Sequence, residues 1–198
     1  GQWSYNDFGV DIQDNTTTVS NLIVENGQLN TKALTSISFD GTSDVVESAG
    51  STDIMNDKDA TLTFWYKGAS PGSAKTILES NASAVQELIY SRAGNEIRLY
   101  STTTSTDEFG LDSTQVTNSA LYDGNWHHMV WVLHNGGDET DHVIYVDGVS
   151  YPVTAISSNN HVVDWNGISI GGRYDDLTAS MRDVRFYDYH LSADQAAS

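Results

Sequence analysis

The chain has 198 residues, of which 27 are acidic and 9 are basic, so its formal net charge at pH 7 is -18. The basic residues are scattered, whereas proteins that bind a phosphate backbone cluster them, which argues against nucleic acid as a partner. No apolar stretch approaches the roughly 20 residues of a membrane helix, which argues against membrane insertion. The absence of cysteine excludes disulfides, thiolate metal sites and a cysteine nucleophile.

The length fits one domain, because β-sandwiches run to about 200 residues without splitting. We therefore expect a single domain over residues 1–198. Aspartate outnumbers glutamate by 20 to 7, a balance that favours turns, strands and oxygen-ligand cation sites over helices.

Short runs of apolar residues, many alternating with polar ones and separated by turn residues, recur along the chain and predict strands. They are SISF (36–39), TLTFWYK (61–67), ELIYS (87–91), EIRLYS (96–101), HHMVWVLH (127–134), HVIYVDG (142–148), GISIGG (167–172) and RDVRFYD (182–188). The polar stretch 101–107 reads as a loop or an exposed edge strand, and Ser192 can cap the single short helix that we expect, at the tail. This spacing predicts an all-β fold, a two-sheet antiparallel β-sandwich of the jelly roll kind.

Side chains alternate between the two faces of a strand, so each run also predicts which residues face the core. In 61–67, Leu62, Phe64 and Tyr66 should face inward and Trp65 outward. Tyr145 should also point outward. In 127–133, the two valines place His128, Val130 and Val132 on the core side and His127, Met129, Trp131 and Leu133 on the other side.

The adjacent histidines His127 and His128 resemble a metal site or a catalytic dyad at first sight. Because neighbouring residues of a strand point to opposite faces, the two imidazoles cannot easily converge on one ion. We expect His128 to be a packed, hydrogen-bonded histidine rather than a ligand.

Six segments together resemble the laminin G-like group of the concanavalin A-like lectin/glucanase superfamily, in that family's order and spacing. They are SFDGTSDVV (38–46), TLTFWYK (61–67), DGNWHHMVWV (123–132), IYVDG (144–148), ISIGG (168–172) and DVRFYDYHLSADQ (183–195). The opening WSYND from Trp3 is similar to the family's first strand, so the resemblance covers nearly the whole chain. It implies a jelly roll, but this fold hosts lectins, adhesion modules, accessory domains and virion components.

The resemblance also suggests calcium. Asp175 and Asp176 follow the GGR turn, on the rim where proteins of this family often hold Ca²⁺ beside the ligand site, and Tyr174 lies on the same rim. Solvated loop acids are the alternative in so acidic a chain. Where similar sequences carry two aspartates before Val-Arg, this chain has Arg182 and Asp183, which speaks against a second cation there.

The outward aromatics suggest a ligand surface, because an aromatic ring on an open sheet face can stack on the apolar face of a sugar. The predicted ligand-binding residues are Trp131, Trp65, Tyr145, His127 and Tyr174. The alternative is that a loop folds over this face and these side chains form a second, smaller core.

Catalysis is the competing class. The glucanases of the superfamily use a Glu-x-Asp-x-x-Glu run on one strand, and no such run occurs here. A lyase using histidine or tyrosine leaves no linear motif and stays open. Because the glutamate run is missing, we expect that the protein is not an enzyme.

The resulting hypothesis is a non-catalytic module that binds a glycan or glycoprotein, with Ca²⁺ as a candidate cofactor, in a larger secreted, cell-surface or virion protein. The acidic surface suits an extracellular, saline setting and disfavours anionic polysaccharides unless calcium bridges them. The alternative is a structural domain, an adhesin spacer or virion decoration that packs against neighbouring protein chains without a sugar ligand.

Overall fold

The computed structural model describes residues 9–13, 23–25, 28–30, 36–42, 44–49, 53–80, 87–102, 106–157, 160–172 and 175–197. The motif at Trp3 and the predicted ligand residue Tyr174 lie outside these ranges. None of the helices within them has the length and apolar character to cross a bilayer.

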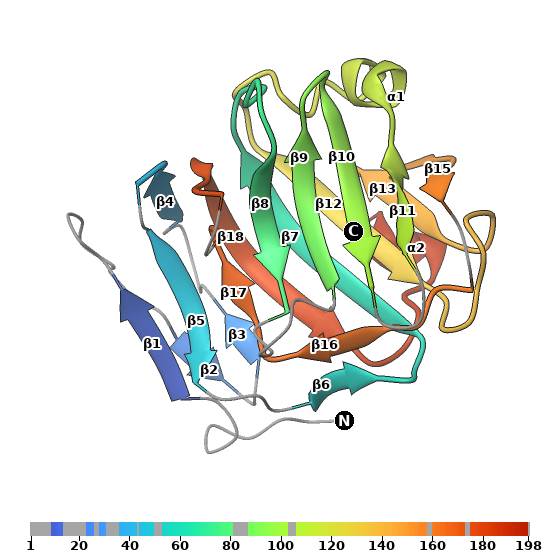
Figure 1. Cartoon of the computed structure of the whole chain (residues 1–198), viewed down its shortest axis with the longest axis horizontal. Coiled ribbons are helices and arrows are strands. Elements are labelled where there is room, and N and C mark those ends of the chain that lie inside the picture. Colours follow the sequence, from blue (N-terminus) through green and yellow to red (C-terminus); the bar gives the residue numbers. More distant parts are fainter. Residues whose placement is uncertain are drawn as a thin grey trace.

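Two antiparallel sheets stack face to face, with the larger in front in Figure 1. The eight-stranded sheet has the order β1 (Gly9–Gln13), β5 (Val45–Ala49), β17 (Ser169–Ile170), β8 (Lys75–Glu79), β9 (Glu87–Arg92), β10 (Glu96–Ser101), β11 (Asp107–Leu111) and β15 (Thr154–Ser157). The six-stranded sheet has the order β14 (Val149–Tyr151), β13 (Val143–Val146), β12 (His127–Leu133), β7 (Ala60–Lys67), β18 (Thr178–Tyr187) and β4 (Ile37–Asp40). The prediction of a two-sheet antiparallel β-sandwich is confirmed.

Smaller elements complete the fold. The strand pairs β6 (Asp53–Asn56) with β16 (Asp164–Asn166), and β2 (Ile23–Glu25) with β3 (Gln28–Asn30), are separate two-stranded sheets. The predicted C-terminal helix is present as α2 (Ala193–Ala196), capped by Ser192. A second helix, α1 (Ser113–Asn118), was not predicted; a capping box between Asp112 and Gln115 starts it.

The main core fills the space between the two sheets. From β7 it takes Leu62, Phe64 and Tyr66, all fully buried, so the predicted inward direction of these side chains is confirmed. Trp65 is half-buried and lies outside this cluster, as predicted.

The predicted directions in β12 are wrong. Trp131 is fully buried in the main core, with Met129 and Leu133 beside it. The pairing of strands explains this, because Trp131 stands directly opposite Leu62 on β7 and Ile144 on β13, both of which face the core. Trp131 therefore belongs to the interior and not to an outer surface.

Val130 and Val132 lie on the outer face of the six-stranded sheet, yet they too are buried. Residues 188–197, which we call the C-terminal segment, cross that face, and Leu191 and Ala196 pack on the two valines. Tyr145 points outward as predicted and is half-buried in the same small cluster. A segment thus folds over part of the outer face, which is the alternative that the sequence left open.

Thr61 fastens this segment to β7. Its hydroxyl donates to the carbonyl of Tyr189 over 2.8 Å and accepts from the amide of Leu191 over 3.0 Å. Both bonds lie at one end of β7, so the segment covers that end of the outer face and leaves the Trp65 end outside the small cluster.

Candidate functional site

Trp65 stands in a row of stacked side chains on the outer face of the six-stranded sheet. Arg182 of β18 and His128 of β12 are its direct neighbours on either side. The His128 ring stacks on the indole with centroids 5.1 Å apart, and the guanidinium of Arg182 lies 4.8 Å from the Trp65 centroid and 4.5 Å from that of Trp126. We call Trp65, His128, Arg182 and Trp126 the tryptophan ladder.

The tryptophan ladder occupies the ring faces of Trp65 from both sides, because its two neighbours come from strands on opposite sides of β7. A sugar that stacks on an indole needs a free ring face. Burial lowers the pKa of the His128 imidazole, and this outweighs the nearby carboxylates of Asp183 and Asp147. Cation–π and stacking contacts hold the ladder together, and they leave mainly the ring edges of Trp65 to a ligand.

His127 was predicted as a ligand residue, but it is 6% exposed and held between two carboxylates. Its Nδ1 lies 2.7 Å from Asp147 Oδ2 and its Nε2 3.0 Å from Asp123 Oδ1. Burial by itself lowers the pKa of His127, but the two hydrogen bonds outweigh it, and the net shift is upward. The bond from His127 lowers the pKa of Asp123 to about 2. His127 thus joins the turns of Asp123 and Asp147 through both ring nitrogens.

We expect an NMR titration to give His127 a pKa above its ordinary 6.5, and Asp147→Asn to lower it, because one carboxylate partner is removed. Since the folded-state pKa is raised, His127 contributes its full stabilisation below pH 6.5 and loses it as the pH rises through the folded-state pKa. Asp194→Asn, at an exposed position of α2, is the matched control and should leave this titration unchanged. An Asp147→Asn protein with the wild-type pKa would contradict the assignment.

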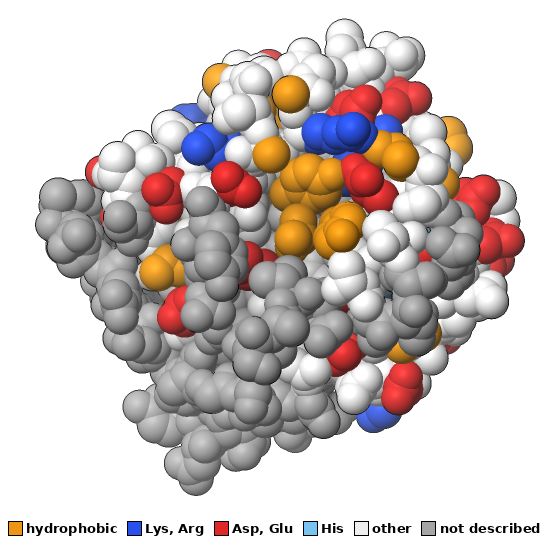
Figure 2. All heavy atoms as spheres, viewed as in Figure 1, with side chains coloured by type: hydrophobic (Ala, Val, Ile, Leu, Met, Phe, Trp, Pro, Cys, Tyr) orange, Lys and Arg blue, Asp and Glu red, His pale blue; other side chains and the backbone are white. Residues whose placement is uncertain are grey.

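The outer face of the eight-stranded sheet carries a different set of aromatic rings. Ile89, Leu99 and Phe109 stand opposite one another and face the core. The alternation along β9 and β10 then directs Leu88, Tyr90 and Tyr100 outward, where all three are half-buried. We call these three residues the tyrosine patch. Figure 2 shows hydrophobic side chains gathered over the middle of this sheet, with charged side chains around them.

The ring faces of the tyrosine patch differ from those of the tryptophan ladder. Among the residues that the structure describes, the stacked or edge-on ring pairs include neither Tyr90 nor Tyr100. A half-buried ring with no ring stacked on it can receive the C–H face of a sugar.

Charged groups border the tyrosine patch. The hydroxyl of Tyr90 donates to Glu108, which also pairs with Arg92 over 3.4 Å. Glu96 pairs with Arg92 over 3.6 Å and accepts from the buried Arg98 over 3.1 Å. Burial, followed by the bond to Glu108, raises the pKa of Tyr90, so its phenol keeps its proton. The border therefore offers both donors and acceptors for sugar hydroxyl groups.

The predicted calcium residues lie at the start of the loop that leads into β18. Asp175 is exposed and Asp176 half-buried, and the carbonyl of Asp175 accepts from the amide of Thr76 over 3.2 Å. In the described part of the chain, the side chains close enough to share one metal ion are instead Asp59, His134 and His190. Calcium at Asp175 and Asp176 stays a prediction.

The tyrosine patch was not predicted, although its alternation is visible in ELIYS and EIRLYS. Trp126 and Arg182 were likewise not predicted as partners of Trp65. The strand pairing that brings these residues together has no counterpart in the linear sequence.

No curated protein matches the sequence significantly. Among solved structures, the chain is similar to the ligand-binding domain of botulinum neurotoxin serotype D in complex with N-acetylneuraminic acid (15% identity, TM-score 0.67, 99% of this chain and 48% of that chain). It is also similar to the receptor-binding domain of the botulinum neurotoxin C/D mosaic serotype (13% identity, TM-score 0.67, 96% and 45%).

The chain spans about half the length of these solved chains, and the likeness concerns the fold. The family model Laminin_G_3 matches residues 40–197. With its two stacked antiparallel sheets, the chain belongs to the concanavalin A-like lectin/glucanases superfamily.

Proposed function

We propose that this protein is a non-catalytic carbohydrate-binding module and that the tyrosine patch is its binding surface. One observation carries the proposal: Tyr90 and Tyr100 stand half-buried on an outer sheet face, next to the charged groups of Arg92, Glu96 and Glu108. Aromatic faces bind the apolar side of a sugar, and the charged groups bind its hydroxyls. The module would act within a larger secreted, cell-surface or virion protein.

The family and the fold support this proposal. The similar neurotoxin domain, of which this chain spans 48%, was solved in complex with N-acetylneuraminic acid. That sugar is an acid, and Arg92 beside the patch, 44% exposed, is a cation that can meet a carboxylate. Sialylated and neutral glycans both belong in the first screen.

Replacing Tyr90 or Tyr100 by alanine should weaken glycan binding at least about tenfold, or ~1.4 kcal/mol, because each change removes one stacking face. A glycan array with and without chelator identifies the ligand, and titration calorimetry on the strongest glycan measures the loss. The chelator arm also tests the predicted calcium. Incubating that glycan with the protein should leave it intact by mass spectrometry, since the proposed module is not an enzyme.

Tyr189→Ala is the matched control, because Tyr189 is a 49% exposed tyrosine on the C-terminal segment, away from the patch. Trp65→Ala reports on the tryptophan ladder of the opposite sheet. If binding survives both tyrosine changes but is lost in Trp65→Ala, the site lies on the six-stranded sheet. If no glycan binds, the carbohydrate proposal is wrong.

A structural role is the second candidate, favoured by two exposed apolar side chains on edge strands. Val149 on β14 is 56% exposed and Ile156 on β15 is 49% exposed. These strands are the last in their sheets and are consecutive in the chain, so two open edges lie close together. Such edges can pair with a neighbouring chain. Light scattering on protein that binds no glycan would test for self-association through them.

A further inference from the structure

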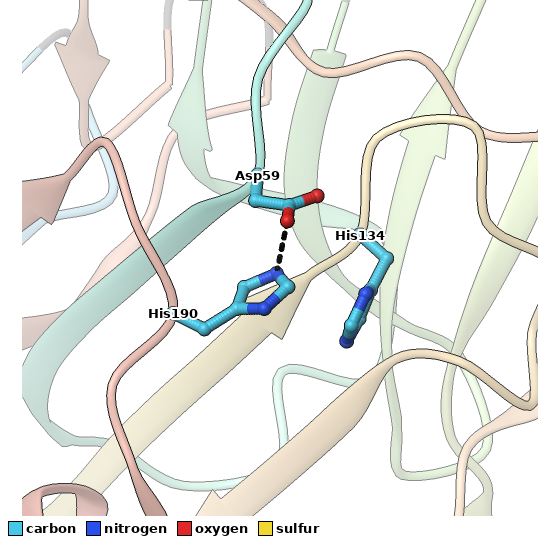
Figure 3. A group of neighbouring side chains, drawn as sticks. All are labelled: Asp59, His134 and His190. Carbon is cyan, nitrogen blue, oxygen red and sulfur yellow. Dashed lines mark ion pairs between the residues drawn. The ribbon is translucent and has the colours of Figure 1, made fainter.

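Three metal-ligating side chains converge beside the end of β12 (Figure 3). Asp59 lies in the turn before β7, His134 directly follows β12, and His190 lies in the C-terminal segment. One ligand atom from each lies within 4.8 Å of the other two. The group is separate from the tyrosine patch and from the predicted calcium residues Asp175 and Asp176.

Backbone groups hold two of these side chains in place. Asp59 Oδ1 accepts from the amide of Asn135 over 3.0 Å, and Oδ2 lies 3.6 Å from His190 Nε2. His190 Nε2 also lies 3.0 Å from the carbonyl oxygen of Leu133, which can only accept a hydrogen bond. Fixed donors and acceptors of this kind orient the ligands of metal sites. The rings of His134 and His190 are 3.8 Å apart between centroids.

The ligand set selects the class of ion. Two imidazoles and a carboxylate suit zinc and its neighbours in the transition series, whereas calcium requires six to eight oxygens. In a tetrahedral zinc site with bonds of about 2.0–2.1 Å, the ligand atoms are roughly 3.3 Å apart. Because His190 Nε2 donates to the carbonyl of Leu133, Nδ1 is the nitrogen left for the ion, and side-chain rotation has to bring it to this separation from the other two ligand atoms.

We propose that Asp59, His134 and His190 bind a divalent metal ion of the zinc type, which ties the C-terminal segment to the six-stranded sheet. Three protein ligands leave a fourth position for water. The ion joins positions 59, 134 and 190 and so closes long loops of the chain. Because only the folded chain brings these three residues together, binding of the ion stabilises the folded state. This site is independent of the proposed glycan binding.

Zn²⁺ added to tag-free, chelator-treated protein should bind with 1:1 stoichiometry in calorimetry and raise the melting temperature. Hydrogen exchange in residues 188–197 should slow when Zn²⁺ binds, because the ion holds that segment down. Co²⁺ should give the visible absorption of a tetrahedral site, and Ca²⁺ should not compete. Asp59→Asn and His134→Ala should each weaken Zn²⁺ binding by about tenfold or more.

Asp57→Asn is the matched control, because Asp57 is an exposed carboxylate in the same turn and lies outside the group. It should bind Zn²⁺ like the wild type. The amide side chain introduced by Asp59→Asn keeps an oxygen that can accept from the Asn135 amide, so this variant should fold normally. Equal losses in Asp57→Asn and Asp59→Asn would reveal diffuse binding to an acidic surface and overturn the proposal. Anomalous scattering that places zinc elsewhere, or no binding at all, would also overturn it.

Discussion

Replacing Trp131 by alanine should lower the free energy of unfolding by about 3–5 kcal/mol, the range for emptying a large aromatic site in a core. The side chain is fully buried between the two sheets and packs with Leu62 and Ile144 from the neighbouring strands. An alanine there leaves a cavity. Because β12 is hydrogen-bonded to β7 on one side and to β13 on the other, the backbone cannot shift to fill it. Urea-induced unfolding measures the change.

Trp131→Phe should cost less than about 2 kcal/mol. Phenylalanine fills most of the volume of the indole. It also removes an indole N–H that meets no hydrogen-bond acceptor among the described residues. Val149→Ala, on the exposed edge strand β14, should change stability by less than about 0.5 kcal/mol. If Trp131→Ala kept the wild-type stability and lost only ligand binding, the interior placement of this residue would be wrong.

Glu87→Gln should gain stability relative to the wild type as the pH rises above the ordinary glutamate pKa of 4.5, by up to about 1.4 kcal/mol per pH unit, until the pH passes the raised folded-state pKa of Glu87. Glu87 is fully buried, accepts from the amide of Asp164 over 2.8 Å and lies 3.3 Å from His161 Nε2. Burial raises the pKa of Glu87 well above its ordinary 4.5, against the opposing effect of the Asp164 amide.

The sign of this effect follows from proton counts. In the unfolded chain Glu87 releases its proton near pH 4.5, whereas in the folded protein burial makes it hold that proton to a higher pH. A raised folded-state pKa gives stabilisation that is complete below the unfolded pKa and is lost as the pH rises. Burial, followed by the nearby His142, lowers the pKa of His161 to about 3, so the histidine has the opposite dependence and loses stability as the pH falls below 6.5.

Urea unfolding of the wild type and Glu87→Gln at four pH values from about 5.5 to 8.5 tests this prediction. Glu139→Gln, at the hairpin tip between β12 and β13, changes the same charge without full burial and is the matched control. Parallel curves for Glu87→Gln would show that the buried pair releases its proton like an exposed glutamate.

The family, the fold and eight of the eighteen strands that the structure describes could be predicted from the sequence, because alternation reports directly on strands that have one dry face. In TLTFWYK the polar threonines mark the outer side, and Leu62, Phe64 and Tyr66 face the core as expected. The other strands, β11 among them, and the helix α1 lie outside the predicted runs, and neither DEFGL of β11 nor STQVTN of α1 has the apolar pattern of its element. A single domain over residues 1–198 stays a prediction; the family model covers 40–197.

The candidate site could be predicted only in kind. Aromatic residues on an open sheet face were expected, but HHMVWVL is buried on nearly all positions of both faces, so its alternation contains no polar side from which to orient it. Choosing the valines as the core side was therefore wrong. Trp131 lies in the interior and His128 on the outer face, which is the reverse of the prediction.

The amino-acid sequence by itself determined the superfamily, the sandwich and the absence of cysteine chemistry, because these depend on local patterns and composition. Only the tertiary structure decided which sheet face is covered, since Leu191 and Ala196 reach Val130 and Val132 from about 60 residues away along the chain. It likewise decided that Tyr90 and Tyr100 share a surface and that Asp59, His134 and His190 meet. Contacts of this kind arise where strands pair and where distant segments of the chain pack together, and neither leaves a periodic signal in the sequence.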